Sequence, residues 1–157
     1  MVRIKLTRRM FALIDNEDFL RVNSLGKWQV GSKGYVTMKK WNGEKYIALK
    51  MHRIVLNMPM FDKRKIDHKN LNKLDNQKHN LRICDDTLNN LNVPKRKGDY
   101  TSLYKGVYKK KNRWYAAITL KSIRKNIGSF KKEKDAAIAY NKEAKNLFGE
   151  FAWLNKI

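Results

Sequence analysis

One short pattern of polar residues constrains this chain more than any other feature. Asp67 and His68 are adjacent, Asn80 follows His68 by twelve residues, and Asn89 follows it by twenty-one. On an extended segment adjacent side chains point to opposite sides, so Asp67 and His68 can face different groups. Histidine can take a proton from water near neutral pH, and carboxylate and amide oxygens are ligands that Mg2+ accepts. The pattern therefore supplies what one-metal phosphodiester cleavage needs.

The surrounding segment adds a Leu-Asp-Asn turn at residues 74–76 and an Asn-Leu-Arg strand entry at residues 80–82. In this order the motifs resemble the HNH nuclease family and its ββα-metal fold. The family's third letter, often His, is Asn89 here, which favours a hard oxygen-coordinated cation over zinc. The resemblance implies these roles: His68 as general base, Asn80 orienting His68, and Asp67 and Asn89 as ligands to one Mg2+ or Mn2+. Taken singly, each of these residues also fits plain turn formation or core packing.

Charge defines the partner. The net charge is +22, with 22 basic and 9 acidic residues in 1–98 and 14 basic and 5 acidic residues in 99–157. Because both halves are basic, we expect a polyanion partner, bound with strong salt dependence. An anionic membrane is the alternative, but no long apolar run and no signal-peptide pattern appears. The lone Cys84 fits a reducing compartment, and we expect a cytoplasmic protein.

The fold class expected is α+β, in two domains with a linker. Residues 1–95 would form the nuclease domain, 96–102 a basic linker, and 103–157 a second domain. In the first, we expect strands near residues 10–14, 27–30, 34–41, 46–49 and 81–84, with Asn42-Gly43 as a hairpin turn. Residues 15–18 offer caps for a helix, and residues 51–58 read as a helix stopped by Pro59. His52 on that helix is more simply a core histidine than a metal ligand, because it lacks a metal-spaced partner.

The C-terminal part predicts three strands, at residues 104–108, 113–120 and 123–130, followed by a helix. Six residues would line the buried face of that helix, with Gly149 just after its end: Ala136, Ala137, Tyr140, Ala144, Leu147 and Phe148. Strand alternation places Trp114, Ala116 and Ile118 on one face, and Tyr115, Ala117 and Thr119 on the other. On the third strand, Arg124 has the opposite parity from Ile123 and Ile127, which we expect under the helix.

Several motifs in this part occur in one order, at residues 104–108, 114–118, 127–130, 135–140 and 148–155. They resemble the APETALA2 DNA-binding domain of plant ethylene-response factors, whose three-stranded sheet enters the major groove. Matching positions give the contact candidates Tyr108, Lys110, Arg113, Thr119, Arg124 and Asn126. Several of the family's arginines are replaced here, so the family's target sequence does not carry over.

Taken together, a nuclease-like part followed by a sheet-and-helix DNA-binding part resembles the mobile HNH endonucleases of phages and viruses. This resemblance implies a site-preferring, nicking endonuclease, encoded by a phage or virus, that acts on double-stranded DNA as a monomer. A second hypothesis is a DNA-binding regulator in which the nuclease half is an inactive scaffold. An RNA-binding accessory protein is disfavoured, because no stacking-aromatic RNA module is visible.

Overall fold

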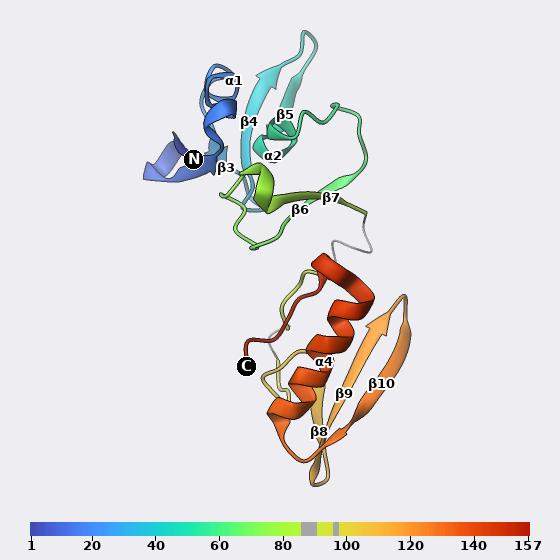
Figure 1. The fold of residues 1–157 in the computed structure, drawn as a ribbon. Helices are drawn as coiled ribbons and strands as arrows, with labels where there is room; N and C mark the ends of the chain where they lie inside the picture. Colours follow the sequence, from blue (N-terminus) through green and yellow to red (C-terminus); the bar gives the residue numbers. More distant parts are fainter. Residues whose placement is uncertain (86–90, 96–97) are drawn as a thin grey trace. The chain divides into compact units, whose positions relative to one another are not determined.

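The computed structural model of this protein describes residues 1–85, 91–95 and 98–157 (Figure 1). The chain divides into two compact units, Met1–Cys84 and Asp85–Ile157. Each unit has its own hydrophobic core. Both combine small antiparallel sheets with few helices. The short helix that we expect to carry Asn89 falls on residues 86–90, which lie outside the described residues.

The first unit contains three small antiparallel sheets. They are formed by Val2–Lys5 (β1) with Phe11–Ile14 (β2), by Gln29–Val30 (β3), Val36–Trp41 (β4) and Tyr46–Lys50 (β5) in the order β3-β4-β5, and by Lys65–His68 (β6) with Leu81–Cys84 (β7). The helices are Phe19–Asn23 (α1) and Met51–Val55 (α2), with single 3-10 turns at Thr7–Arg9 (η1), Asn16–Asp18 (η2) and Lys78–Asn80 (η3). The strands expected near residues 10–14, 34–41, 46–49 and 81–84 are confirmed, whereas β1 was not expected.

The core of the first unit forms around Trp28, which is 1% exposed. Its indole Nε1 donates to the carbonyl of Val22 at 3.0 Å, so the one polar atom of a large buried ring is satisfied. Ile14, Val36 and Met51, from β2, β4 and α2, are buried in the same cluster. These contacts join the first two sheets and both helices into one body that supports the β6–β7 hairpin.

Helix α2 ends at Val55, three residues earlier than expected. Asn57 adopts a left-handed φ of 51°, and the backbone N of Met58 donates to the carbonyl of Arg53. The physical reason lies in Pro59, which disfavours helical backbone in the residue before it. The Arg53 guanidinium then holds the following loop by donating to the carbonyls of Pro59 and Asp62.

The second unit is a three-stranded antiparallel sheet covered by one helix. The elements are Val107–Lys110 (β8), Arg113–Leu120 (β9), Ile123–Phe130 (β10), Glu133–Phe148 (α4) and the 3-10 turn Gly149–Phe151 (η4), with strand order β10-β9-β8. The second and third strands agree with prediction. The first begins at Val107 instead of Tyr104, because Gly106 turns there with a φ of 74° and any Cβ would collide with the Tyr140 ring.

Helix α4 packs on the sheet through small residues. Ala136, Ala137 and Ala144 are completely buried, which brings the helix close to Ala116 and Ile118 of β9. Leu147 is 42% exposed, so its expected place on the buried face is wrong; the last turn is covered by Phe148 instead. Within the described ranges, no helix has the length and apolar character needed to cross a membrane.

Residues before β8 belong physically to the second unit. The Lys105 ammonium donates to the carbonyls of Leu91 and Val93, and Lys95 donates to the carbonyl of Tyr104 at 3.1 Å. Leu91 also packs against the second core. Residues 91–95, which we expected to close the nuclease domain, therefore lie on the second unit. Of the expected linker, Arg96 and Lys97 lie outside the described residues, while Ser102 is buried.

Candidate active site and nucleic-acid interface

The β6–β7 hairpin places Asp67 and His68 on opposite faces. Its register sets Asp67 against Arg82 and His68 against Leu81. The Asp67 Oδ2 atom accepts two hydrogen bonds from Arg82, from Nε at 2.9 Å and from Nη2 at 2.6 Å. Both side chains are buried, so this ion pair fixes the orientation of the carboxylate.

His68 lies in an aromatic cage. Its ring centroid is 5.9 Å from that of Tyr35 and 5.4 Å from that of His52, and its Nε2 lies 3.4 Å from Asn76 Oδ1. Burial lowers the pKa of the His68 imidazole, against an opposing effect of the Asn76 hydrogen bond. Burial, reinforced by the charge of His68, lowers the pKa of His52 to about 3. Both rings therefore favour the neutral form, and the expectation that His52 is a core histidine is confirmed.

Asn80 binds the loop rather than the imidazole. Its Nδ2 donates to the carbonyl of Asp75 at 2.8 Å, and its Oδ1 accepts from the backbone N of Asn70 at 3.0 Å. We expected Asn80 to orient His68, but the amide beside that ring belongs to Asn76. Asn80 instead closes the loop between β6 and β7, because a side-chain amide can satisfy a backbone donor and acceptor together.

The same loop is tied to the start of the chain. The backbone N of Leu13 donates to Leu74 at 2.8 Å, and the backbone N of Asn76 donates to Leu13 at 2.8 Å. The Asp15 carboxylate accepts from the backbone N of Lys78 at 2.8 Å. Asp15 was expected to cap the following helix, but no side-chain cap is formed there. Its role is to hold the loop that carries Asn76.

Lysines rim this site. The Lys73 ammonium lies 4.5 Å from the Tyr35 ring centroid and donates to the carbonyl of Lys33, and the Lys50 ammonium lies 5.8 Å from the same ring. A cation over an aromatic face is stabilised by the ring quadrupole. The arrangement keeps positive charge next to His68, where a phosphate could be attracted.

Of the two expected metal ligands, Asp67 can be placed and Asn89 lies outside the described residues. Across residues 1–85, 91–95 and 98–157, no group of three His, Cys, Asp or Glu side chains gathers in a metal-binding arrangement. The chemistry of Asp67 fits Mg2+ or Mn2+, since a carboxylate is a hard oxygen donor.

A comparison with curated proteins finds an uncharacterised HNH endonuclease from Acanthamoeba polyphaga mimivirus. The two sequences are 32% identical over 136 residues, which is 83% of this chain and 67% of the relative. The chain belongs to the HNH endonuclease family. No protein-family model matches it, and no solved structure matches it.

Sequence reasoning missed several residues of the candidate site. Those that the structure adds around Asp67 and His68 are Tyr35, Lys73, Asn76 and Arg82. Asn76 could have been found from the sequence, because it lies in the Leu-Asp-Asn turn of the motif. Arg82 could have been found by pairing the two strands, since the register sets it opposite Asp67. Tyr35 directly precedes β4, far from Asp67 and His68 in the sequence, so only the tertiary fold reveals it.

In the second unit, the sheet has two distinct faces. Trp114, Ala116 and Ile118 pack toward α4, as expected from alternation. Residues directly paired across antiparallel strands share a face, and the register pairs Tyr108 with Tyr115, Lys110 with Arg113, Arg124 with Thr119 and Asn126 with Ala117. The six expected contact residues therefore lie together on the face away from α4: Tyr108, Lys110, Arg113, Thr119, Arg124 and Asn126.

One neighbour on β10 departs from expectation. Ile123 is 75% exposed and is not part of the core, whereas Ile127 packs against it. Ile123 comes directly after the Lys121-Ser122 turn, where both residues have positive φ. Strand alternation alone predicted that Ile123 lies under the helix. A residue beside the tip of a hairpin, however, has few neighbours that could bury it.

Aromatic and cationic groups are organised on this outer face. The Arg124 guanidinium lies 5.0 Å from the Tyr108 ring centroid, and Tyr108 stacks on Tyr115 at 5.5 Å. Arg113 donates to Ser129 through Nε and Nη2. A hollow of about 970 Å³ opens beside them, and its lining includes Lys95, Lys105, Tyr108, Lys121 and Arg124. The face is thus concave, basic and aromatic.

Proposed function

We propose that this protein is a metal-dependent DNA endonuclease that nicks one strand at preferred sites. One observation carries the proposal. Asp67 and the neutral His68 are adjacent residues of β6, and their side chains point to opposite faces of the hairpin. Family membership supports a nucleolytic role. A single such site per chain suits cutting one strand at a time.

In this proposal the neutral imidazole of His68 takes a proton from water, and Asn76 holds the ring through Nε2. The rings of Tyr35 and His52 exclude solvent from two sides of the base. Asp67 and Asn89 would hold Mg2+ or Mn2+. When bound, such a cation stabilises negative charge on the leaving 3′ oxygen.

Arg82 and Asn80 serve as positioning residues. Arg82 donates to Asp67 Oδ2 from Nε at 2.9 Å and from Nη2 at 2.6 Å, so it fixes the orientation of the carboxylate. Asn80 closes the loop that presents Asn76. Because each acts through another residue, we expect loss of Arg82 or Asn80 to displace Asp67 or Asn76 and to lower the rate only through that displacement.

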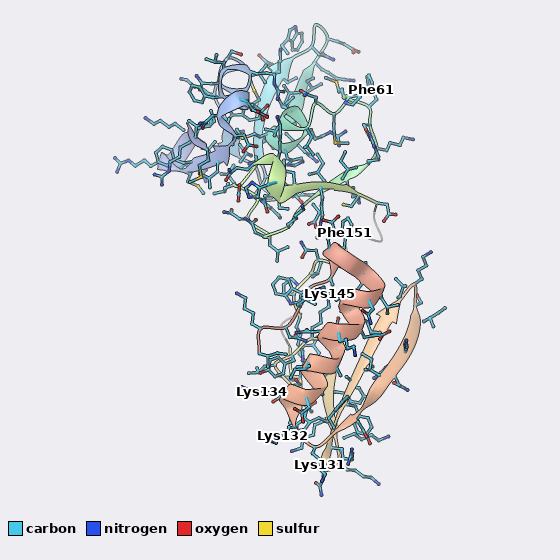
Figure 2. All side chains as sticks on the ribbon, viewed as in Figure 1. Phe61, Lys131, Lys132, Lys134, Lys145 and Phe151 are labelled. Atoms are coloured by element: carbon cyan, nitrogen blue, oxygen red, sulfur yellow. The ribbon has the colours of Figure 1, made fainter. Side chains whose placement is uncertain are left out.

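Site preference is assigned to the outer face of the second unit's sheet. Charge alone does not single out this face, since Lys131, Lys132 and Lys134 gather at the start of α4 on the other side (Figure 2). The aromatic support of Arg124 does single it out, because a guanidinium held over Tyr108 is preorganised to contact a base edge or a phosphate.

The test is conversion of supercoiled plasmid to open circles by the purified full-length chain. We expect nicking with Mg2+ or Mn2+ and none after chelation. Cleavage that resists chelation would contradict the one-metal scheme. DNA binding without any nicking would favour the second candidate, a DNA-binding regulator, which the capture of Asp67 by Arg82 makes a specific alternative.

A further inference from the structure

The β4–β5 hairpin carries two large aromatic side chains that the described residues leave uncovered. Trp41 is 53% exposed and Tyr46 is 69% exposed. They are directly paired in the strand register, and their rings meet edge to face at 5.2 Å. Exposing two such rings together is unfavourable in water, so their pairing at the hairpin tip calls for an occupant.

The tip is built to present these rings in one orientation. The Asn42 Oδ1 atom accepts from the backbone N of Glu44 at 3.0 Å and of Lys45 at 2.8 Å, and Gly43 adopts a φ of 102°. These bonds fix the turn without help from the core. The hairpin runs away from β6 and β7 (Figure 1), and every residue from 39 to 46 is exposed. A rigid projection of this kind loses little entropy when it binds.

One face of the hairpin leads from the tip back to the candidate active site. The register pairs Thr37 with Lys50, Lys39 with Ala48 and Trp41 with Tyr46, so these six share the face away from the buried Val36 and Met38. At the inner end the Lys50 ammonium lies over Tyr35, whose ring is 5.9 Å from that of His68. We call Lys39, Lys50, Trp41 and Tyr46 the hairpin track.

The composition of the track selects one class of occupant. Along the track, Lys50 at the inner end and Lys39 come before the two rings at the tip. Cations beside exposed aromatic rings suit a nucleic acid strand, whose phosphates take the lysines and whose bases or sugars pack on the rings. An acidic protein surface would use the lysines but would leave the two rings without a matched partner.

We propose that the hairpin track binds the DNA strand flanking the scissile phosphate, with lysines on phosphates and the Trp41–Tyr46 pair against a base or sugar. This inference rests on the proposed nuclease function. Six residues separate Tyr35 from Trp41, which at about 3.3 Å per residue is about 20 Å. Since duplex DNA rises about 3.4 Å per base pair, the aromatic pair reaches about six base pairs from the nick.

The first experiment measures contact without cleavage. Full-length wild type and Trp41→Phe are compared for acrylamide quenching of tryptophan fluorescence, with and without a duplex of about 30 base pairs, or three turns, in chelator. The difference between the two proteins reports Trp41. We expect duplex DNA to protect Trp41, and the double variant Trp41→Ala/Tyr46→Ala to bind about tenfold more weakly.

Phe61→Ala is the matched control. Phe61 is 90% exposed on the loop between α2 and β6 (Figure 2), so its loss removes an even more exposed ring outside the track. We expect its DNA affinity to equal that of wild type. An equal loss in both variants would mean that the effect is nonspecific and would overturn the proposal.

The second experiment uses duplexes trimmed from either end toward a mapped nick. The nicking rate of wild type should fall when one flank becomes shorter than about six base pairs. The nicking rate of Trp41→Ala/Tyr46→Ala should not change on the same trimming. Unprotected Trp41 in a chain that nicks DNA would overturn the track alone. Protected Trp41 in a chain that never nicks would support the track and overturn the nuclease. Self-association of wild type that the double variant abolishes, without protection by DNA, would make the surface a contact between copies.

Discussion

At the scale of single residues, His52 shows how burial, together with nearby positive charge, keeps an imidazole neutral. It is 4% exposed, and its Nδ1 has no hydrogen-bond partner among the described residues. The imidazole therefore stays neutral in the fold, with its pKa near 3. A neutral ring between Tyr35 and His68 supports the base sterically without placing a second positive charge beside it.

We predict that His52 makes the fold sensitive to acid. Its folded pKa lies below the ordinary value of about 6.5, so the unfolded chain binds a proton first as the pH falls. The stability associated with neutral His52 is complete above about pH 6.5 and is lost toward pH 3, by about 1.4 kcal/mol per pH unit. His52→Phe should flatten this dependence of the free energy of unfolding, measured by urea denaturation at several pH values.

The control for this prediction is His79→Gln, because His79 is an exposed histidine outside the core. It should keep the wild-type pH dependence. If wild type and His52→Phe lose stability equally steeply on acidification, burial of His52 is not the cause.

At the scale of elements, the loop between β6 and β7 depends on a side-chain amide. Asn80→Ala leaves the carbonyl of Asp75 and the backbone N of Asn70 without their partner. We predict a loss of about 1–3 kcal/mol in the free energy of unfolding, the usual cost of an unsatisfied buried polar group. Asn72→Ala, which removes only an exposed turn bond to Leu74, should cost less. Equal losses in urea denaturation would refute the assignment of Asn80 to loop closure.

On the sheet of the second unit, Arg124→Ala distinguishes two kinds of DNA contact. If Arg124 reads a base, its loss should cost about 1–3 kcal/mol at one target position. If it grips a phosphate, all sequences weaken alike and the salt slope falls by about one. We expect the base contact, because Lys110, on the same face of the sheet, already supplies a cation. Competition binding against a randomised duplex pool decides the matter, and unchanged binding at every salt concentration would remove this face from the interface.

Local patterns predicted these elements well where local forces decide them. The bounds of β9 and β10 follow from alternation and turn residues, and the β4–β5 hairpin follows from Asn42-Gly43. The errors at Ile123 and Leu147 concern burial near element ends, where neighbours far away in the sequence decide the outcome. The role of Asn80 was missed for the same reason, since hydrogen-bond partners depend on how a loop closes.

At the scale of the whole molecule, the chain is two units with separate cores. The second includes residues 91–95, held by the Lys105 and Lys95 bonds. We predict that residues 85–157 alone fold and bind DNA with the sequence preference of the full chain, because the sheet face and its support lie within them. Selection from a randomised duplex pool measures that preference. A fragment that folds, by circular dichroism, yet binds all sequences equally would move site preference to the first unit.

The central claim is that His68 is the general base of a metal-dependent nuclease. The most direct measurement compares His68→Ala with wild type in Mg2+-dependent nicking of supercoiled plasmid, with DNA affinity measured in parallel. We predict a rate about 10²- to 10⁴-fold lower with nearly unchanged affinity, since a general base contributes about that much to the rate. A His68→Ala variant that nicks at the wild-type rate would contradict the account.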